Sequence, residues 1–126
     1  MDAGDVREAR VAAERHGRRA EWLASLYLYC RGFHIIARRF KAAGGEIDLV
    51  AQRGGLLVFA EVKARPSLDE AVLAVTPKAR RRMEAARRMF LARHPRLAEL
   101  AQRYDILAVA GFRVRHVADA WREEDR

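Results

Sequence analysis

The chain has 126 residues, of which 51% are hydrophobic and 33% charged, and its 25 Lys and Arg against 17 Asp and Glu give a formal net charge of +8. The length fits a single domain spanning residues 1–126. The hydrophobic fraction excludes a disordered chain, and no apolar run approaches the roughly 18 residues that a membrane-spanning helix needs. The positive charge indicates a polyanionic partner, nucleic acid first and an anionic membrane surface second.

The N-terminal residues and the single cysteine predict the cellular compartment of the protein. The first five residues include two acids and lack the apolar core of a secretory signal. Cys30 has no second cysteine to pair with, which fits a reducing cytoplasm. We therefore expect a cytoplasmic protein in which residues 1–12 and 123–126 are mobile and Cys30 lies in the core.

The first predicted element is a long helix followed by three strands. Asp5 and Glu8 have the spacing of a capping box, and the helix is expected to continue to about Arg31. Its buried face is predicted from residues at helical spacing, which are Ala20, Leu23, Ala24, Tyr27 and Leu28. Three β-prone segments follow, separated by glycine-containing turns, over residues 33–40, 46–52 and 56–65.

The second half of the chain is predicted to contain one more long helix and two strands. Residues 67–75 are interpreted as a loop or one helical turn, whereas Thr76 and Pro77 are typical of a helix start. That helix is expected to end at His94–Pro95, with Ala79, Met83, Ala86 and Phe90 on its inner face. The remaining elements are a short helix over 96–103, strands over 104–110 and 112–117, and a helical turn over 118–121. The order αβββαββ predicts one α/β domain.

The second and third predicted strands carry the pattern with chemical meaning. If Gly54–Gly55 closes a two-residue hairpin, Asp48 lies opposite Glu61 and Glu46 opposite Lys63. The other face of the hairpin is then wholly apolar, which supports this register, with Ile47, Leu49, Ala51, Val58, Ala60 and Val62. Two directly opposed carboxylates destabilise a sheet unless a cation bridges them or one takes up a proton.

This pattern predicts a site for a hard divalent cation. Carboxylate oxygens favour Mg²⁺ or Mn²⁺ over zinc. Lys63 projects from the same face as Glu61, where an ammonium can hold a water molecule or stabilise charge on a phosphate. Glu21, at the margin of the buried face of the first helix, can complete the site, and Gly17 one turn earlier permits close approach. These parts are consistent with phosphodiester hydrolysis, which needs a metal ion to activate water and absorb developing charge. The alternative is a solvated sheet face with cross-strand ion pairs.

Five segments also carry a resemblance to a known family, in the order Gly17-Arg-Arg-Ala-Glu21, Gly45-Glu-Ile-Asp-Leu-Val50, Val58-Phe-Ala-Glu-Val-Lys-Ala-Arg65, Ala74-Val-Thr-Pro-Lys78 and Tyr104-Asp-Ile106. Between about Gly17 and Trp121 the chain resembles the YraN family of small bacterial proteins regarded as endonucleases. That family is similar to Holliday junction resolvases and to the PD-(D/E)xK nuclease superfamily. The resemblance implies a restriction-endonuclease-like, or tRNA-endonuclease-like, three-layer fold with a central mixed sheet flanked by helices.

The resemblance also implies roles for individual residues. Asp48 and Glu61 would be metal ligands, with the Val62 carbonyl as a third ligand. Lys63 would be the catalytic lysine, and Glu21 the acid borne by the helix. The cofactor implied is Mg²⁺ or Mn²⁺.

Basic residues outside this site are candidates for phosphate-backbone contacts. Lys78 lies at a predicted helix N-terminus, where backbone N–H groups attract anions. Several arginines are expected on the outer faces of the same helix, namely Arg80, Arg81, Arg82, Arg87 and Arg88, and we predict that Arg81 and Arg82 bind phosphates. We also predict phosphate binding by three basic residues at the end of a strand, Arg38, Arg39 and Lys41. Trp22, Tyr104 and Trp121 are expected to pack in the core, and the four histidines receive no catalytic role.

These observations predict a metal-dependent endonuclease that hydrolyses structured or single-stranded DNA. Two alternatives stay open, a non-catalytic nucleic-acid-binding or adaptor module on a nuclease fold, and an RNA substrate. By analogy with junction resolvases, a symmetric homodimer is also expected. Membrane binding becomes remote, because it offers no reason for facing carboxylates inside a basic protein.

Overall fold

The computed structural model describes residues 3–123, without the side chains of residues 8–16. Its elements run in the order α1 (Ala3–Cys30), β1 (His34–Ala42), β2 (Gly45–Arg53), β3 (Leu56–Ala64), α2 (Leu68–Leu73), α3 (Pro77–Arg93), the short 3-10 helix η1 (Leu97–Glu99), β4 (Ala101–Ala110) and β5 (Arg113–Trp121). The predicted α/β class is therefore confirmed.

The five strands form one mixed sheet in the order β1-β2-β3-β4-β5. Only β3 and β4 are parallel, and the other three neighbouring pairs are antiparallel. A parallel pair requires a long crossover connection, which here contains α2, α3 and η1. The central strands β2 and β3 are rich in apolar residues, as expected for strands covered on both faces.

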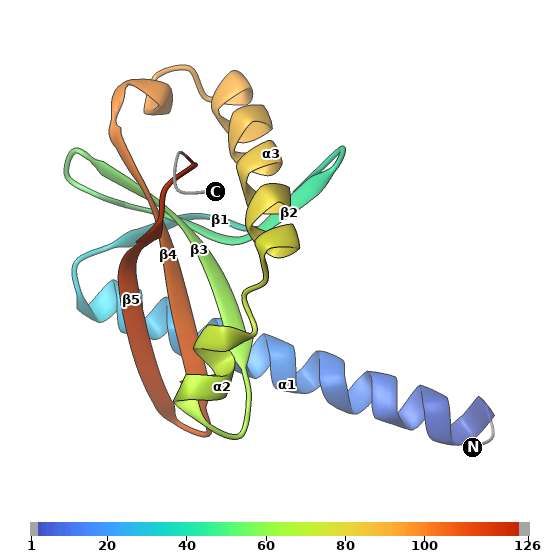
Figure 1. Cartoon of the computed structure of the whole chain (residues 1–126). Helices are drawn as coiled ribbons and strands as arrows, with labels where there is room; N and C mark the ends of the chain where they lie inside the picture. The colour runs from blue at the N-terminus through green and yellow to red at the C-terminus, as the bar shows by residue number, and fades with distance from the viewer. Residues whose placement is uncertain (1–2, 124–126) are drawn as a thin grey trace.

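Helices cover the two faces of the sheet, as Figure 1 shows. On one face α1 buries Ala20, Ala24 and Leu28 against strand residues such as Leu49 and Val58. On the other face α3 buries residues predicted for its inner side, Met83, Ala86 and Phe90, against a second set that includes Phe59 and Tyr104. The N-terminal half of α1 extends beyond the sheet (Figure 1). Two apolar cores thus enclose the sheet between layers of helix.

Gly45, the first residue of β2, allows α3 to approach the sheet closely. A Cβ atom at this position would lie 1.9 Å from the backbone oxygen of Arg82. No side chain can be accommodated at that distance, so the glycine sets the contact between β2 and α3.

Several predicted elements are corrected by the structure. The first helix begins at Ala3, so Asp5 lies inside its first turn and not at the N-cap, and Glu8 belongs to the undescribed side chains. Within residues 67–75, Leu68–Leu73 form a helix, α2, because Ser67 and Glu70 make a complete capping box. The predicted helical turn over 118–121 is wrong, since β5 continues to Trp121. The predicted short helix over 96–103 is only η1, and β4 begins at Ala101.

Two predictions about single residues also change. Cys30 and Trp22 are exposed, not buried, because both lie outside the stripe of α1 that faces the sheet. Tyr104 and Trp121 are buried and stack on each other, as expected for packing residues. The mobility predicted for the chain ends stays a prediction: residues 3–12 are helical, and residues 1–2 and 124–126 lie outside the described residues.

Candidate functional site

The hairpin of β2 and β3 has the predicted register, but its pairing ends one residue before the predicted acid pair. Among described residues the ladder runs from Arg53–Leu56 to Leu49–Ala60. Asp48 does not form the next pair with Glu61. Instead, its Oδ2 atom accepts a hydrogen bond from the backbone nitrogen of Val62 at 2.8 Å. The two strands therefore separate at the point where the acids lie.

The same irregularity corrects the predicted apolar face. Ile47 packs with the core under α3, whereas Leu49, two residues later, packs with the core under α1. Regular pleating would place both on one face, so the pleat is interrupted at Asp48. The alternating sequence pattern gives no sign of this interruption of the pleat. The prediction therefore placed Ile47 on the same face as Leu49.

Glu61 and Lys63 stand together on the face of β3 that α3 covers. They have the same parity along the strand as Leu57 and Phe59, which belong to the core under α3. The Lys63 Nζ atom lies 3.4 Å from Glu61 Oε1. Glu61 is buried, while the Lys63 side chain keeps 28% of its surface exposed. The Lys63 ammonium is thus held by the Glu61 carboxylate and is still accessible to solvent.

Both acids of the predicted pair are electrostatically strained in this position. Burial raises the pKa of Asp48 to about 6, with the charges of Glu21 and Glu46 adding to the effect, although the Val62 N–H and Lys63 oppose it. Burial and the neighbouring Asp48 raise the pKa of Glu61 to about 8, again against the effect of Lys63. One ammonium therefore does not neutralise this group of carboxylates.

Glu21 is near the site but already has a cationic partner. Its charge contributes to the raised pKa of Asp48, which places it within electrostatic range. However, its Oε2 atom accepts a hydrogen bond from Arg39 Nε at 2.7 Å. The expected close approach at Gly17 is not observed, because no described atom lies within 4 Å of the position its Cβ would take.

The donor set suits a divalent cation bound by few protein ligands. In the described part of the chain, no group of three or more His, Cys, Asp or Glu side chains is arranged to hold a metal ion. Mg²⁺ commonly takes only one or two carboxylates and completes its shell with water and substrate oxygens. The half-buried Asp48 and the buried Glu61, whose charges Lys63 compensates only in part, fit that mode of binding.

The basic residues predicted to bind phosphates have different surroundings. Lys78, Arg81 and Arg82 are exposed on α3. Lys41 is exposed and pairs with Glu46 across β1 and β2. On the side of α1, Arg38 donates to Ser25 Oγ and Arg39 to Glu21. The set is therefore distributed over both layers and does not form one stripe.

Two arginines predicted on the outer faces of α3 point inward instead. Arg87 donates to Tyr104 and Gln102, and the Arg80 guanidinium lies over the Trp121 ring at 5.2 Å from its centroid. Helical periodicity predicted the outer position, but the C-terminal strands extend far enough to cover this part of α3.

A buried polar network centred on Asp105 was not predicted. Asp105 is fully buried. It accepts two hydrogen bonds from Arg103 at 2.8 Å, one from the backbone of Asp119 at 2.9 Å, and lies 2.6 Å from His116 Nε2. The spacing Arg103-x-Asp105 puts both side chains on one side of a strand, which is the signal in the sequence that could have indicated the pair.

The fold and site define a mixed α/β domain in which a buried acid, a half-buried acid and a lysine meet where two central strands separate. The profile described as "Uncharacterised protein family UPF0102" matches residues 20–109. Similar proteins include "UPF0102 protein amb4503" of Paramagnetospirillum magneticum, 45% identical over 97% of this chain and 98% of its own, and a UPF0102 protein of Chelativorans sp., 50% identical over 83% and 85%.

The chain belongs to the UPF0102 family, which is the YraN family that the sequence motifs resemble. No helix in the described part of the chain combines the length and apolar character that crossing a membrane requires.

Proposed function

We propose that this protein is a divalent-metal-dependent endonuclease on a restriction-endonuclease-like fold, hydrolysing phosphodiester bonds in structured or single-stranded DNA. One observation carries the proposal. Asp48 and Glu61 lie where β2 and β3 separate, both with a pKa raised by burial and by neighbouring acids, and Lys63 Nζ stands 3.4 Å from Glu61. A solvated ion-pair network would not place a buried Glu61 and a half-buried Asp48 beside one lysine.

The residues that would hold the metal are Asp48 and Glu61, with the Val62 carbonyl as a further ligand and Glu21 as the acid from α1. When bound, a divalent cation activates water and offsets the charge that develops on the phosphate. The excess carboxylate charge around Asp48 provides the reason for a cation to bind here.

The chain's own groups have separate tasks in this proposal. The Val62 N–H fixes the Asp48 carboxylate. Lys63, held by Glu61 yet partly exposed, directs an ammonium donor toward an attacking water or a phosphate oxygen. The exposed Lys78, Arg81 and Arg82 of α3 bind the sugar-phosphate backbone, which positions the substrate without reading its sequence.

The experiment is a cleavage assay on matched DNA and RNA panels of junctions, flaps and single strands, with Mg²⁺ or with EDTA. The proposal expects Mg²⁺-dependent cleavage of DNA. Cleavage of RNA but not of DNA would assign RNA as the substrate. Light scattering on the same samples tests the homodimer expected by analogy.

A non-catalytic nucleic-acid-binding module is the second candidate. It is favoured by the Arg39–Glu21 ion pair, which occupies the carboxylate that α1 would bring to the metal. This candidate expects DNA binding that weakens steeply with salt, because binding phosphates releases counterions, and no cleavage. DNA binding that does not respond to salt would exclude it.

A further inference from the structure

A second site lies at the other end of the sheet. A pocket of about 430 Å³ opens where β3 and β4 begin, and its lining includes Leu56, Arg87, Gln102, Tyr104, Trp121 and Glu123. Leu56 is the first residue of β3 and pairs with Ala101, the first of β4. Lys63 is seven residues further along β3, roughly 23 Å away at the rise of an extended strand. The pocket is therefore separate from the acidic site.

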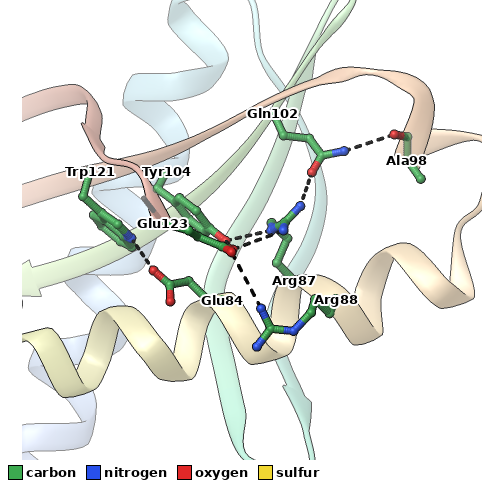
Figure 2. Close-up of polar contacts among 8 residues, drawn as sticks. All are labelled: Glu84, Arg87, Arg88, Ala98, Gln102, Tyr104, Trp121 and Glu123. Carbon is green, nitrogen blue, oxygen red and sulfur yellow. Dashed lines mark hydrogen bonds and ion pairs between the residues drawn. The ribbon is translucent and has the colours of Figure 1, made fainter. Parts of the chain in front are cut away.

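Figure 2 shows donors from α3 and β4 converging on one carboxylate in this pocket. The Glu123 Oε1 atom accepts hydrogen bonds from Tyr104 Oη at 2.6 Å and from Arg87 Nη2 at 3.1 Å. Arg88 Nη1 lies 3.8 Å from the other carboxylate oxygen. Two guanidinium groups and a phenol thus surround a single anionic group.

Two of these donors, Arg87 and Tyr104, are held in place by residues other than Glu123. Arg87 also donates through Nε to Tyr104 Oη at 2.7 Å and through Nη1 to Gln102. Gln102 is itself fixed, because its Nε2 donates to the Ala98 carbonyl at 3.1 Å. Since Tyr104 accepts from Arg87 while donating to Glu123, the two hydrogen bonds polarise each other favourably. The donor cluster would therefore persist without the Glu123 carboxylate.

The aromatic wall of the pocket is equally well anchored. Tyr104 and Trp121 stack with ring centroids 4.8 Å apart and planes 7° from parallel. Trp121 Nε1 donates to the buried Glu84 of α3 at 3.1 Å. The pocket thus combines a rigid aromatic wall with a preorganised anion-binding end.

Glu123 lies outside the sheet, at the end of the described residues. It lies two residues after the last residue of β5, and 30% of its side chain is exposed. Burial raises its pKa, but the hydrogen bond from Tyr104 and the charge of Arg87 lower it below the ordinary value overall. The group is therefore an ionised carboxylate, bound as a separate anion would be.

We propose that this pocket binds the phosphate monoester of a nucleotide-sized ligand, which takes the place of the Glu123 carboxylate. A phosphate offers more acceptor oxygens than a carboxylate, and guanidinium groups match its geometry well. The volume lies within the range typical of small-molecule sites, and the Leu56 side and aromatic wall supply an apolar surface for a ring. The chemistry is shared by a free nucleotide and by the phosphorylated end of a strand.

The test is calorimetric titration of the full chain with four probes: inorganic phosphate, a nucleoside 5′-monophosphate, a 5′-phosphorylated oligonucleotide, and the same oligonucleotide without the phosphate. Glu123→Gln removes the competing charge, so phosphate-dependent affinity should rise by about tenfold. Glu99→Gln, an exposed acid outside the pocket, is the matched control and should leave it unchanged. Tyr104→Phe in the Glu123→Gln background removes only a hydroxyl and should lower the affinity again.

Two results distinguish the source of the ligand and both support the site: binding of the free nucleotide as well as the oligonucleotide, or of the phosphorylated oligonucleotide alone. The proposal is overturned if Glu123→Gln gains no phosphate-dependent affinity while circular dichroism shows it folded. Inorganic phosphate that binds as tightly as the nucleotide would also overturn the assignment of a nucleotide-sized ligand.

Discussion

The carboxylate of Asp48 accepts a hydrogen bond from the backbone nitrogen of Val62, 2.8 Å away, beyond the point where the pairing of β2 with β3 ends. This contact brings the acid of β2 beside Glu61 and Lys63, the neighbours of Val62 on β3. The break in the ladder therefore creates the site, because a continued ladder would leave no opening between the strands.

Replacing Lys63 with Ala should separate chemistry from binding. We expect Mg²⁺-dependent cleavage to fall by at least about 100-fold, because a positioned proton donor or charge-stabilising group contributes that much. DNA affinity, measured by fluorescence anisotropy, should change less than about twofold, since phosphate contacts elsewhere dominate it. Equal losses of binding and cleavage would instead assign Lys63 to substrate binding.

Replacing Glu61 with Gln should have opposite effects on stability with and without metal. Without metal we expect a Tm a few degrees higher, because the raised pKa of Glu61 means that folding must either bury its charge or protonate it, and Gln removes that cost. With Mn²⁺ at a hundredfold excess over its Kd, the wild type should gain about 2.7 kcal/mol and the variant much less. Glu46→Gln, which neutralises a nearby acid that is not a predicted ligand, should retain the Mn²⁺ effect. An unchanged response in Glu61→Gln would remove Glu61 from the metal site.

The Asp105 network makes stability depend on pH. Although burial raises its pKa, hydrogen bonds from His116, Arg103 and the Asp119 backbone lower it below 3.8 overall. A lowered pKa in the folded state means that the stabilisation is present above pH 4 and is lost as the pH falls through the folded value. Denaturant unfolding should therefore show less acid sensitivity between pH 5 and 3 in Asp105→Asn than in the wild type.

The same substitution should cost about 3 kcal/mol at neutral pH, because it leaves Arg103 without its buried carboxylate partner. Asp69→Asn, which alters an exposed ion pair with Arg115, is the control and should cost under about 1 kcal/mol. Equal losses in the two variants would mean that the buried network contributes no more than a surface pair.

Gly45 should tolerate no side chain. In Gly45→Ala the new methyl group would meet the Arg82 carbonyl at 1.9 Å, and the backbone of α3 must shift, so we expect a loss of about 3 kcal/mol. Gly55→Ala is the matched control, because no described atom lies within 4 Å of its Cβ position, and it should cost under about 1 kcal/mol. Similar unfolding midpoints for the two variants in urea would contradict this account of the contact between β2 and α3.

The sequence predicted what depends on local pattern. The helix start at Thr76 and Pro77 and the hairpin register from Arg53 to Leu49 are both confirmed, because caps and turns act over a few residues. It did not predict the pleat break at Asp48 or the inward direction of Arg87. Both depend on tertiary partners, the Val62 backbone in one case and Tyr104 in the other, which residue spacing does not encode.

The most direct test of the proposed metal site is a crystal of the protein soaked in Mn²⁺ and measured for anomalous scattering. We predict one strong peak between Asp48 and Glu61, with carboxylate oxygens about 2 Å away and Lys63 alongside. A crystal saturated with Mn²⁺ that shows no peak between these two carboxylates would contradict the account.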